Sequence, residues 1–140
     1  MNSDKEMKEI LLATKVIASV GLSGNQQKES FGIAAYLQEQ GYQIIPVNPT
    51  ATEILGEKAY PDLESVPLKI DLVQVFRKPE DVPPVVDDAI KVGAKVVWMQ
   101  VGIENEEAAA KASAAGLQVV MNACMRIMHR TLIGTKPISL

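Results

Sequence analysis

Five short runs of apolar, largely β-branched residues, separated by segments of helical character, constrain the fold of this chain more than any other feature. Residues 16–21, 70–76 and 95–100 are the clearest runs, and residues 42–47 and 117–121 follow the same pattern. Each run has the length of a strand and ends in turn residues. Near-continuous apolar character is typical of parallel strands that are covered on both faces.

The segments between these runs are predicted to be helices, over residues 4–13, 31–40, 82–92, 106–115 and 124–130. Three have a candidate N-cap and a glycine placed to end the helix; the pairs are Ser30 with Gly41, Asp81 with Gly93, and Asn105 with Gly116. Alternating strands and helices predict an α/β, Rossmann-like fold, a doubly wound parallel five-stranded sheet with helices on both faces. We expect residues 1–140 to form one domain, in which residues 49–67 are a long connection with at most a short helical turn.

Composition and charge exclude several classes of protein. The net charge of −3 gives no general attraction to nucleic acid, so any anion site must be built locally. A single cysteine, Cys124, excludes an internal disulfide and fits a reducing compartment. The first residues lack the pattern of a signal peptide, and no apolar run has the length of a membrane span. We therefore expect a cytoplasmic protein without a membrane or nucleic-acid partner.

The loop after the first predicted strand is the first candidate site. Ligands of doubly wound sheets bind beyond the carboxyl ends of the strands. Here the chain runs from Gly21 to Ser30, with a second glycine at position 24 and a helix directly afterwards. Free N–H groups at a helix start attract phosphate, and Ser23, Lys28 and Ser30 can add hydrogen bonds and charge. The alternative is a tight strand-to-helix turn without a ligand.

Two further strand ends narrow the ligand class. A dinucleotide site for NAD normally has G-x-G-x-x-G in the first loop and a carboxylate at the end of the second strand. This chain has Ser23 at the middle glycine position, and its second strand ends Val47-Asn48-Pro49. The third strand ends in Phe76 followed by Arg77 and Lys78, two cations suited to a multiply phosphorylated nucleotide. The alternative for Arg77 and Lys78 is a solvated basic turn that binds no ligand. Trp98, in the fourth strand, is predicted to be a core residue.

These segments resemble the CoA-binding protein family, stand-alone relatives of the N-terminal domain of the succinyl-CoA synthetase α subunit. The resemblance covers about residues 10–132. It rests on residues 20–23 (VGLS) with Ser30 following, 45–49 (IPVNP), 56–61 (GEKAYP), 75–79 (VFRKP), 98–102 (WMQVG) and 119–124 (VVMNAC).

The resemblance implies that coenzyme A lies across the strand ends. The loop from Gly21 through Leu22 and Ser23 to Lys28 and Ser30 would then bind the phosphates. Val47, Asn48 and Pro49 would contact the adenosine part, and Phe76, Arg77 and Lys78 would border the pantetheine and the phosphates. The loop sequence SGNQQKES varies within the family, and relatives often have an acidic residue and a proline where this chain has Asn122-Ala123-Cys124-Met125.

No catalytic set is apparent. The only histidine, His129, is predicted to lie at the surface or at the edge of a ligand, and Asp62 and Glu64 are interpreted as solvated. Cys124 is either a quiet thiol or a group that forms a mixed disulfide with CoA. We therefore predict non-catalytic binding of CoA or an acyl-CoA, with either a second copy of the chain or a ligase chain as protein partner. The alternatives are an NAD(P)-binding oxidoreductase, a CoA-ligase subunit that needs a separate ATP-grasp partner, and a scaffold that has lost its ligand.

Overall fold

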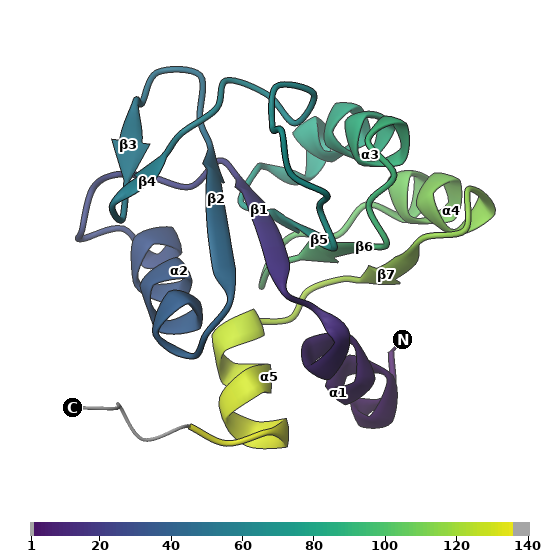
Figure 1. The fold of residues 1–140 in the computed structure, drawn as a ribbon. Coiled ribbons are helices and arrows are strands. Elements are labelled where there is room, and N and C mark those ends of the chain that lie inside the picture. Colours follow the sequence, from purple (N-terminus) through teal and green to yellow (C-terminus); the bar gives the residue numbers. More distant parts are fainter. Residues whose placement is uncertain (1, 136–140) are drawn as a thin grey trace.

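The computed structural model describes residues 2–135, which are built around a parallel sheet of five strands (Figure 1). The strands lie in the order β2 (Gln43–Val47), β1 (Val16–Val20), β5 (Leu72–Val75), β6 (Val96–Met99) and β7 (Gln118–Val120). Every pair is parallel, and Val20 is in register with both Val47 and Val75. The carboxyl ends of the strands therefore meet at one edge of the sheet.

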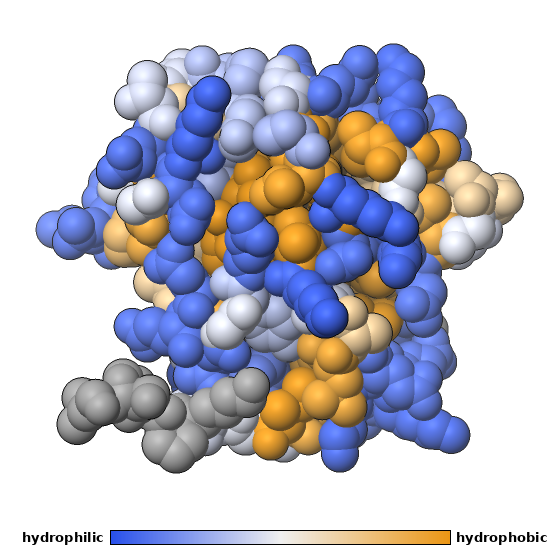
Figure 2. Space-filling view, in the orientation of Figure 1, coloured by the Kyte–Doolittle hydropathy of each residue, from blue (hydrophilic) through white to orange (hydrophobic). Residues whose placement is uncertain are grey.

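Helices cover both faces of the sheet, as the alternating pattern predicted. One face packs against α1 (Asp4–Ala13), α2 (Glu29–Glu39) and α5 (Met125–Leu132), and the other against α3 (Val82–Lys91) and α4 (Glu106–Ala114). Side chains alternate between the two layers, so that Ile17 and Trp98 belong to the first core while Ala18 and Val97 belong to the second. Trp98 is fully buried, as predicted. The face in Figure 2 is mainly hydrophilic, with hydrophobic surface near its middle and, separately, beside α1 and α5.

The predicted helix ends are right at the glycines and mixed at the N-caps. Gly41, Gly93 and Gly116 all have positive φ, which ends the preceding helix. Asn105 caps α4 by accepting a hydrogen bond from the Ala108 N–H at 2.9 Å. Asp81 stands at the N-cap position of α3 but makes no side-chain cap bond, because the 3₁₀ helix η1 (Pro79–Asp81) already leads into α3.

The connection between β2 and β5 contains a structure that the sequence analysis missed. A small antiparallel hairpin joins β3 (Glu53–Ile54) to β4 (Glu57–Lys58). Leu55 and Gly56 form its turn with φ of 57° and 74°, the two positive values that a type I′ turn requires. Ile54 of β3 is buried and packs in the first core. The expected long connection with at most a helical turn is therefore wrong in this part, because two-residue strands are too short to show a period.

His129 is buried and lines none of the described cavities, in contrast to its predicted position at the surface or at the edge of a ligand. Only 2% of its surface is exposed, and its Nδ1 lies 2.8 Å from the hydroxyl of Tyr36. The Tyr42 ring also meets the imidazole edge-on, with 5.7 Å between centroids. Burial, and then the nearby Tyr36, raise the pKa of Tyr42 to about 12. The helical period of α5 turns His129 inward, so the imidazole contacts Tyr36 of α2 and Tyr42, which directly precedes β2.

Candidate ligand site at the strand ends

The site lies where the sheet order reverses. From β1 the chain proceeds through α2 to β2 on one side and then crosses to β5 on the other side of β1. Such a reversal of strand order leaves a crevice between the carboxyl ends of β1 and β5. Here the Phe76 N–H donates to the Val20 carbonyl at 2.9 Å, and the Gly21 N–H donates to the Val47 carbonyl at 3.0 Å. These bonds hold the ends of three strands together at the crevice.

Gly21 is required at this position by conformation and by space. Its φ is 87°, a value that side-chain-bearing residues rarely adopt. A Cβ at this residue would lie 2.4 Å from the carbonyl oxygen of Phe76 and 3.3 Å from the Cδ of Arg77. The absence of a side chain therefore lets the end of β1 pack directly against the segment that follows β5, which carries Phe76 and Arg77.

The loop from Gly21 to Ser30 satisfies many of its own hydrogen bonds. The Ser23 N–H donates to Ser30 Oγ at 3.2 Å, and the Asn25 N–H donates to Ser23 Oγ at 3.0 Å. Asn25 Oδ1 in turn accepts from the Gln27 N–H at 2.9 Å. The loop is thus ordered by its own side chains, and two of the predicted phosphate contacts already hold each other.

This arrangement corrects the predicted start of α2. Ser30 is not the N-cap, because its hydroxyl accepts from Ser23 and the helix already begins at Glu29. Lys28 occupies the cap position and makes no side-chain cap bond. Apart from the Phe31 N–H, which donates to the Lys28 carbonyl at 3.1 Å, the N–H groups of the first turn and the positive end of the helix dipole can therefore attract an anion.

A cavity of about 340 Å³ adjoins this helix start. Ser30 and Glu29 line it from α2, and Phe76, Arg77 and Lys78 line it from the end of β5. Four predicted site residues are thereby brought together around one space. The exposed Glu29 carboxylate is the one acidic side chain among the described residues that line this cavity.

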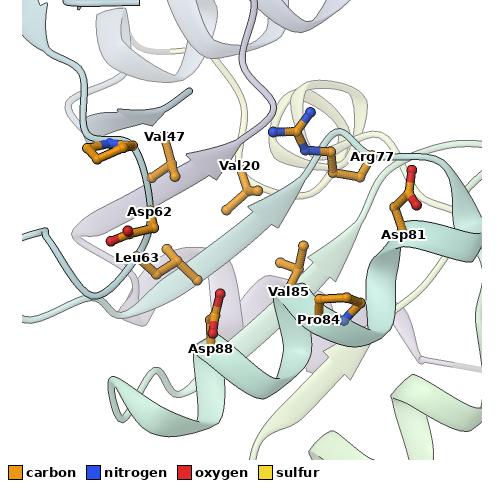
Figure 3. A pocket seen from close by; sticks show the side chains of 10 residues that line it. Val20, Val47, Asp62, Leu63, Arg77, Asp81, Pro84, Val85 and Asp88 are labelled. Carbon is orange, nitrogen blue, oxygen red and sulfur yellow. The ribbon is translucent and has the colours of Figure 1, made fainter. Parts of the chain in front are cut away.

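A second cavity of about 310 Å³ lies on the other side of Arg77 (Figure 3). Val20, Val47, Leu63 and Val85 provide apolar walls, and Arg77 is shared with the first cavity. Three carboxylates also line it, from Asp62, Asp81 and Asp88. Hydrogen bonds from the hydroxyl and the N–H of Ser65 lower the pKa of Asp62. An acidic, partly apolar wall of this kind suits a base or sugar better than a phosphate.

The remaining predicted residues are placed differently. Asn48 uses its side chain within the protein, because Nδ2 donates to the Leu22 carbonyl at 3.0 Å and Oδ1 accepts from the Thr50 N–H at 2.9 Å. The Leu22 side chain is fully buried, which leaves only its backbone near the site. Lys28 and Pro49 are exposed and line neither cavity.

Gln100 is a site residue that the sequence analysis did not select. It follows β6, lines the first cavity and is 4% exposed. Its Oε1 accepts from the Met125 N–H at 3.3 Å, whereas its Nε2 is the one buried side-chain atom without a hydrogen-bond partner among residues 2–135. A polar residue that ends an otherwise apolar strand was the available signal. Cys124, which is 5% exposed, lines the same cavity from the start of α5.

Within the described residues, no group of three or more His, Cys, Asp or Glu side chains could hold a metal ion. The same residues contain no helix with the length and apolar character to cross a membrane.

Comparisons with known proteins identify the family of this chain and support its fold. A family model described as a CoA binding domain matches residues 15–130. The chain is 42% identical over 127 residues to the uncharacterized protein YneT of Bacillus subtilis (strain 168), covering 91% of this chain and 94% of YneT. The solved structure of a hypothetical protein from Pyrococcus horikoshii OT3 has a TM-score of 0.92 at 44% identity, covering 95% of this chain and 94% of that one.

A larger relative is similar in part. The chain is 32% identical over 87 residues to the ADP-forming acetate–CoA ligase II of Archaeoglobus fulgidus, covering 61% of this chain but only 13% of the ligase. Because the family model matches residues 15–130 and the fold is a Rossmann-like sheet, the chain belongs to the family of CoA-binding domains, as the resemblance implied.

Proposed function

We propose that residues 1–140 form a single cytoplasmic domain that binds coenzyme A, free or acylated, at the carboxyl edge of its sheet without a catalytic step of its own. The observation that carries this proposal is the packing of Gly21 against Phe76, which brings the start of α2 and the Arg77-Lys78 pair to one cavity. The match to the CoA-binding family supports CoA as the ligand of that cavity.

The phosphates belong near the start of α2 in this proposal. Arg77 and Lys78 supply positive charge, and the first-turn N–H groups supply donors. Gly21, Ser23 and Ser30 fix the conformation of the loop. The backbone of Leu22 and the exposed side chain of Lys28 would complete the phosphate site. These groups would attract and orient coenzyme A, but they include no pair of reactive side chains that could catalyse a reaction on it.

The adenine ring and the ribose belong in the cavity shown in Figure 3, with the 3′-phosphate of the ribose directed to Arg77, which this cavity shares with the first. Val47 lines that cavity, while Asn48 and Pro49 continue the strand end beside it. The pantetheine arm would then pass Phe76 toward Gln100. This path follows the order of strands β2, β1, β5 and β6 across the sheet.

Titration calorimetry with CoA, NAD and NADP tests the proposal. We expect heat with CoA and none with NAD or NADP, because the end of β2 carries Asn48-Pro49 in place of a ribose-binding carboxylate. Arg77→Ala should weaken CoA binding about 10- to 100-fold, the range for a charge-assisted hydrogen bond of about 1.5–3 kcal/mol. Arg130→Ala is the matched control, since Arg130 is exposed on α5 and lines neither cavity. Equal losses in both variants, or no binding of CoA to the folded protein, would refute the proposal.

A second candidate is a CoA-ligase subunit, which the similarity to the acetate–CoA ligase favours. Because the chain matches only 13% of that ligase, the remaining ligase functions would have to come from another chain. Affinity purification from the source cells, followed by mass spectrometry, should then recover an ATP-grasp chain in stoichiometric amount. Recovery of the protein alone would favour the stand-alone binding domain.

A further inference from the structure

A third and larger cavity lies beside β7, at the edge of the sheet. Its volume is about 830 Å³, within the range of small-molecule sites in proteins. It is lined from α1, α4, β7 and α5, and we call it the β7 groove. Much of its wall is apolar, including Met7, Ala109, Val119, Met121, Ile127 and Met128.

The β7 groove adjoins the cavity at the start of α2. Val101 and Cys124 line both spaces. A CoA molecule laid along β2, β1, β5 and β6 reaches this junction with its thiol end, because β7 is the next strand in the sheet. The β7 groove therefore begins where the pantetheine arm of the proposed ligand ends.

The charge of the groove selects among acyl groups. Its charged lining residues, Asp4, Glu104 and Glu106, are all acidic, and the described lining contains no Lys or Arg. A dicarboxylic acyl group such as succinyl would place a carboxylate among these side chains and be repelled. A neutral apolar chain would instead cover surface such as Val101 and Ile127, which are 64% and 49% exposed.

Gln100 supplies a polar group at the junction. Its Nε2 is buried beside Cys124 without a partner among the described residues, while its Oε1 holds the first N–H of α5. A buried amide donor without an acceptor is costly unless a ligand satisfies it. In a thioester the carbon bonded to sulfur carries a carbonyl oxygen that a free thiol lacks, and this oxygen is a hydrogen-bond acceptor for Nε2.

We propose that the β7 groove receives the acyl chain of a CoA thioester, that Gln100 Nε2 donates to the thioester carbonyl, and that the acyl group is neutral and apolar. This inference rests on the proposed function, since it assumes that CoA occupies the strand ends. It makes an apolar acyl-CoA the ligand in preference to free CoA or a dicarboxylic acyl-CoA.

Calorimetry with CoA, octanoyl-CoA and succinyl-CoA tests the inference. Octanoyl-CoA should bind at least about tenfold more tightly than CoA, because each buried methylene adds to affinity, and succinyl-CoA should bind no more tightly than CoA. Ala110→Trp, on the exposed side of α4 in the groove lining, should reduce octanoyl-CoA binding to the level of CoA and leave CoA unchanged. Ala114→Trp is the matched control, on the same helix and outside the lining.

The thioester contact has a separate readout. S-octyl-CoA has the same chain length but lacks the carbonyl, so the wild type should bind octanoyl-CoA more tightly, and Gln100→Met should abolish that preference. An absent preference in the wild type would overturn the role of Gln100.

The remaining outcomes are distinct. If CoA binds and octanoyl-CoA binds no better, the groove assignment is wrong while the proposed function stands. If neither CoA nor octanoyl-CoA binds to the folded protein, both fail. If Ala110→Trp changes the sedimentation of the protein and octanoyl-CoA binds no better than CoA, the groove is a contact between copies of the chain and the inference is overturned.

Discussion

Replacing Gly21 by alanine should separate the two physical requirements on the residue at the end of β1. One requirement is the positive φ of 87°, which costs an L-residue about 1–2 kcal/mol. The other is the space between the strand ends, because the new Cβ would lie 2.4 Å from the carbonyl oxygen of Phe76. Neither the carbonyl nor the strand that carries it can move without disturbing the sheet.

Gly116→Ala provides the matched control. Gly116 has a φ of 90°, nearly the same as Gly21, but a Cβ there would meet no atom within 4 Å. We expect the control to lose only the conformational part, about 1–2 kcal/mol. Gly21→Ala should lose a further 1–3 kcal/mol or so, the usual range for overpacking. It should also weaken CoA binding, since relief of the clash moves the ends of β1 and β5 apart.

Urea unfolding followed by tryptophan fluorescence measures the difference. Trp98 is the single tryptophan of the chain and is fully buried in the first core, so its emission reports on the packed sheet. CoA affinity is measured on the same preparations by calorimetry. Equal losses of unfolding free energy in the two variants, together with unchanged CoA binding by Gly21→Ala, would refute the close-approach argument.

Three further predictions concern other parts of the structure. Asn105→Ala should destabilise the protein to urea by at least about 1 kcal/mol, because it loses both the α4 cap and the Nδ2 bond to the Pro79 carbonyl, whereas Asn105→Ser loses only the Pro79 bond and should be less destabilised; equal losses would contradict the cap. Because burial raises the pKa of Tyr42 from 10.0 to about 12, the neutral phenol stabilises the folded state fully below pH 10, and that contribution is lost as the pH rises toward 12. The difference in unfolding free energy between the wild type and Tyr42→Phe should therefore narrow over that interval, and a constant difference would contradict this. Ser19→Ala leaves Gln74 Oε1 without its 2.8 Å donor and should cost about 1–3 kcal/mol in urea unfolding, while the double variant with Gln74→Met should recover part of the loss; no recovery would contradict the buried pair.

The order of elements could be predicted because its signals are local. Short apolar runs and glycine stops depend on residues within a few positions of one another, and the five strands of the parallel sheet lie within the predicted ranges. The hairpin at residues 53–58 escaped because its strands have two residues each. The predicted N-cap at Ser30 was wrong because the Ser30 hydroxyl accepts a hydrogen bond from the Ser23 N–H in the loop.

The candidate site was predictable only to the level of strand ends. Arg77 and Lys78 could be placed there because each follows a recognisable strand, and they do line a common cavity with Ser30. The prediction could not tell that the Asn48 amide is engaged with the Leu22 carbonyl, 26 residues away along the chain. The helical period of α5 places His129 on the same side as Met125, but only the tertiary structure shows that this side packs against α2.

By itself the sequence determined the alternation of strands and helices, the carboxyl edge as the place of the candidate site, and the resemblance to the family to which the chain belongs. The tertiary structure decided which polar groups are available there and how far the site extends. Hydrogen-bond satisfaction is a property of the folded neighbourhood: Gln100 has one end of its amide bonded to Met125 and the other without a partner among residues 2–135 only because β6 ends beside the start of α5. The β7 groove exists for the same reason, since its walls come from α1, α4, β7 and α5, segments that only folding brings together.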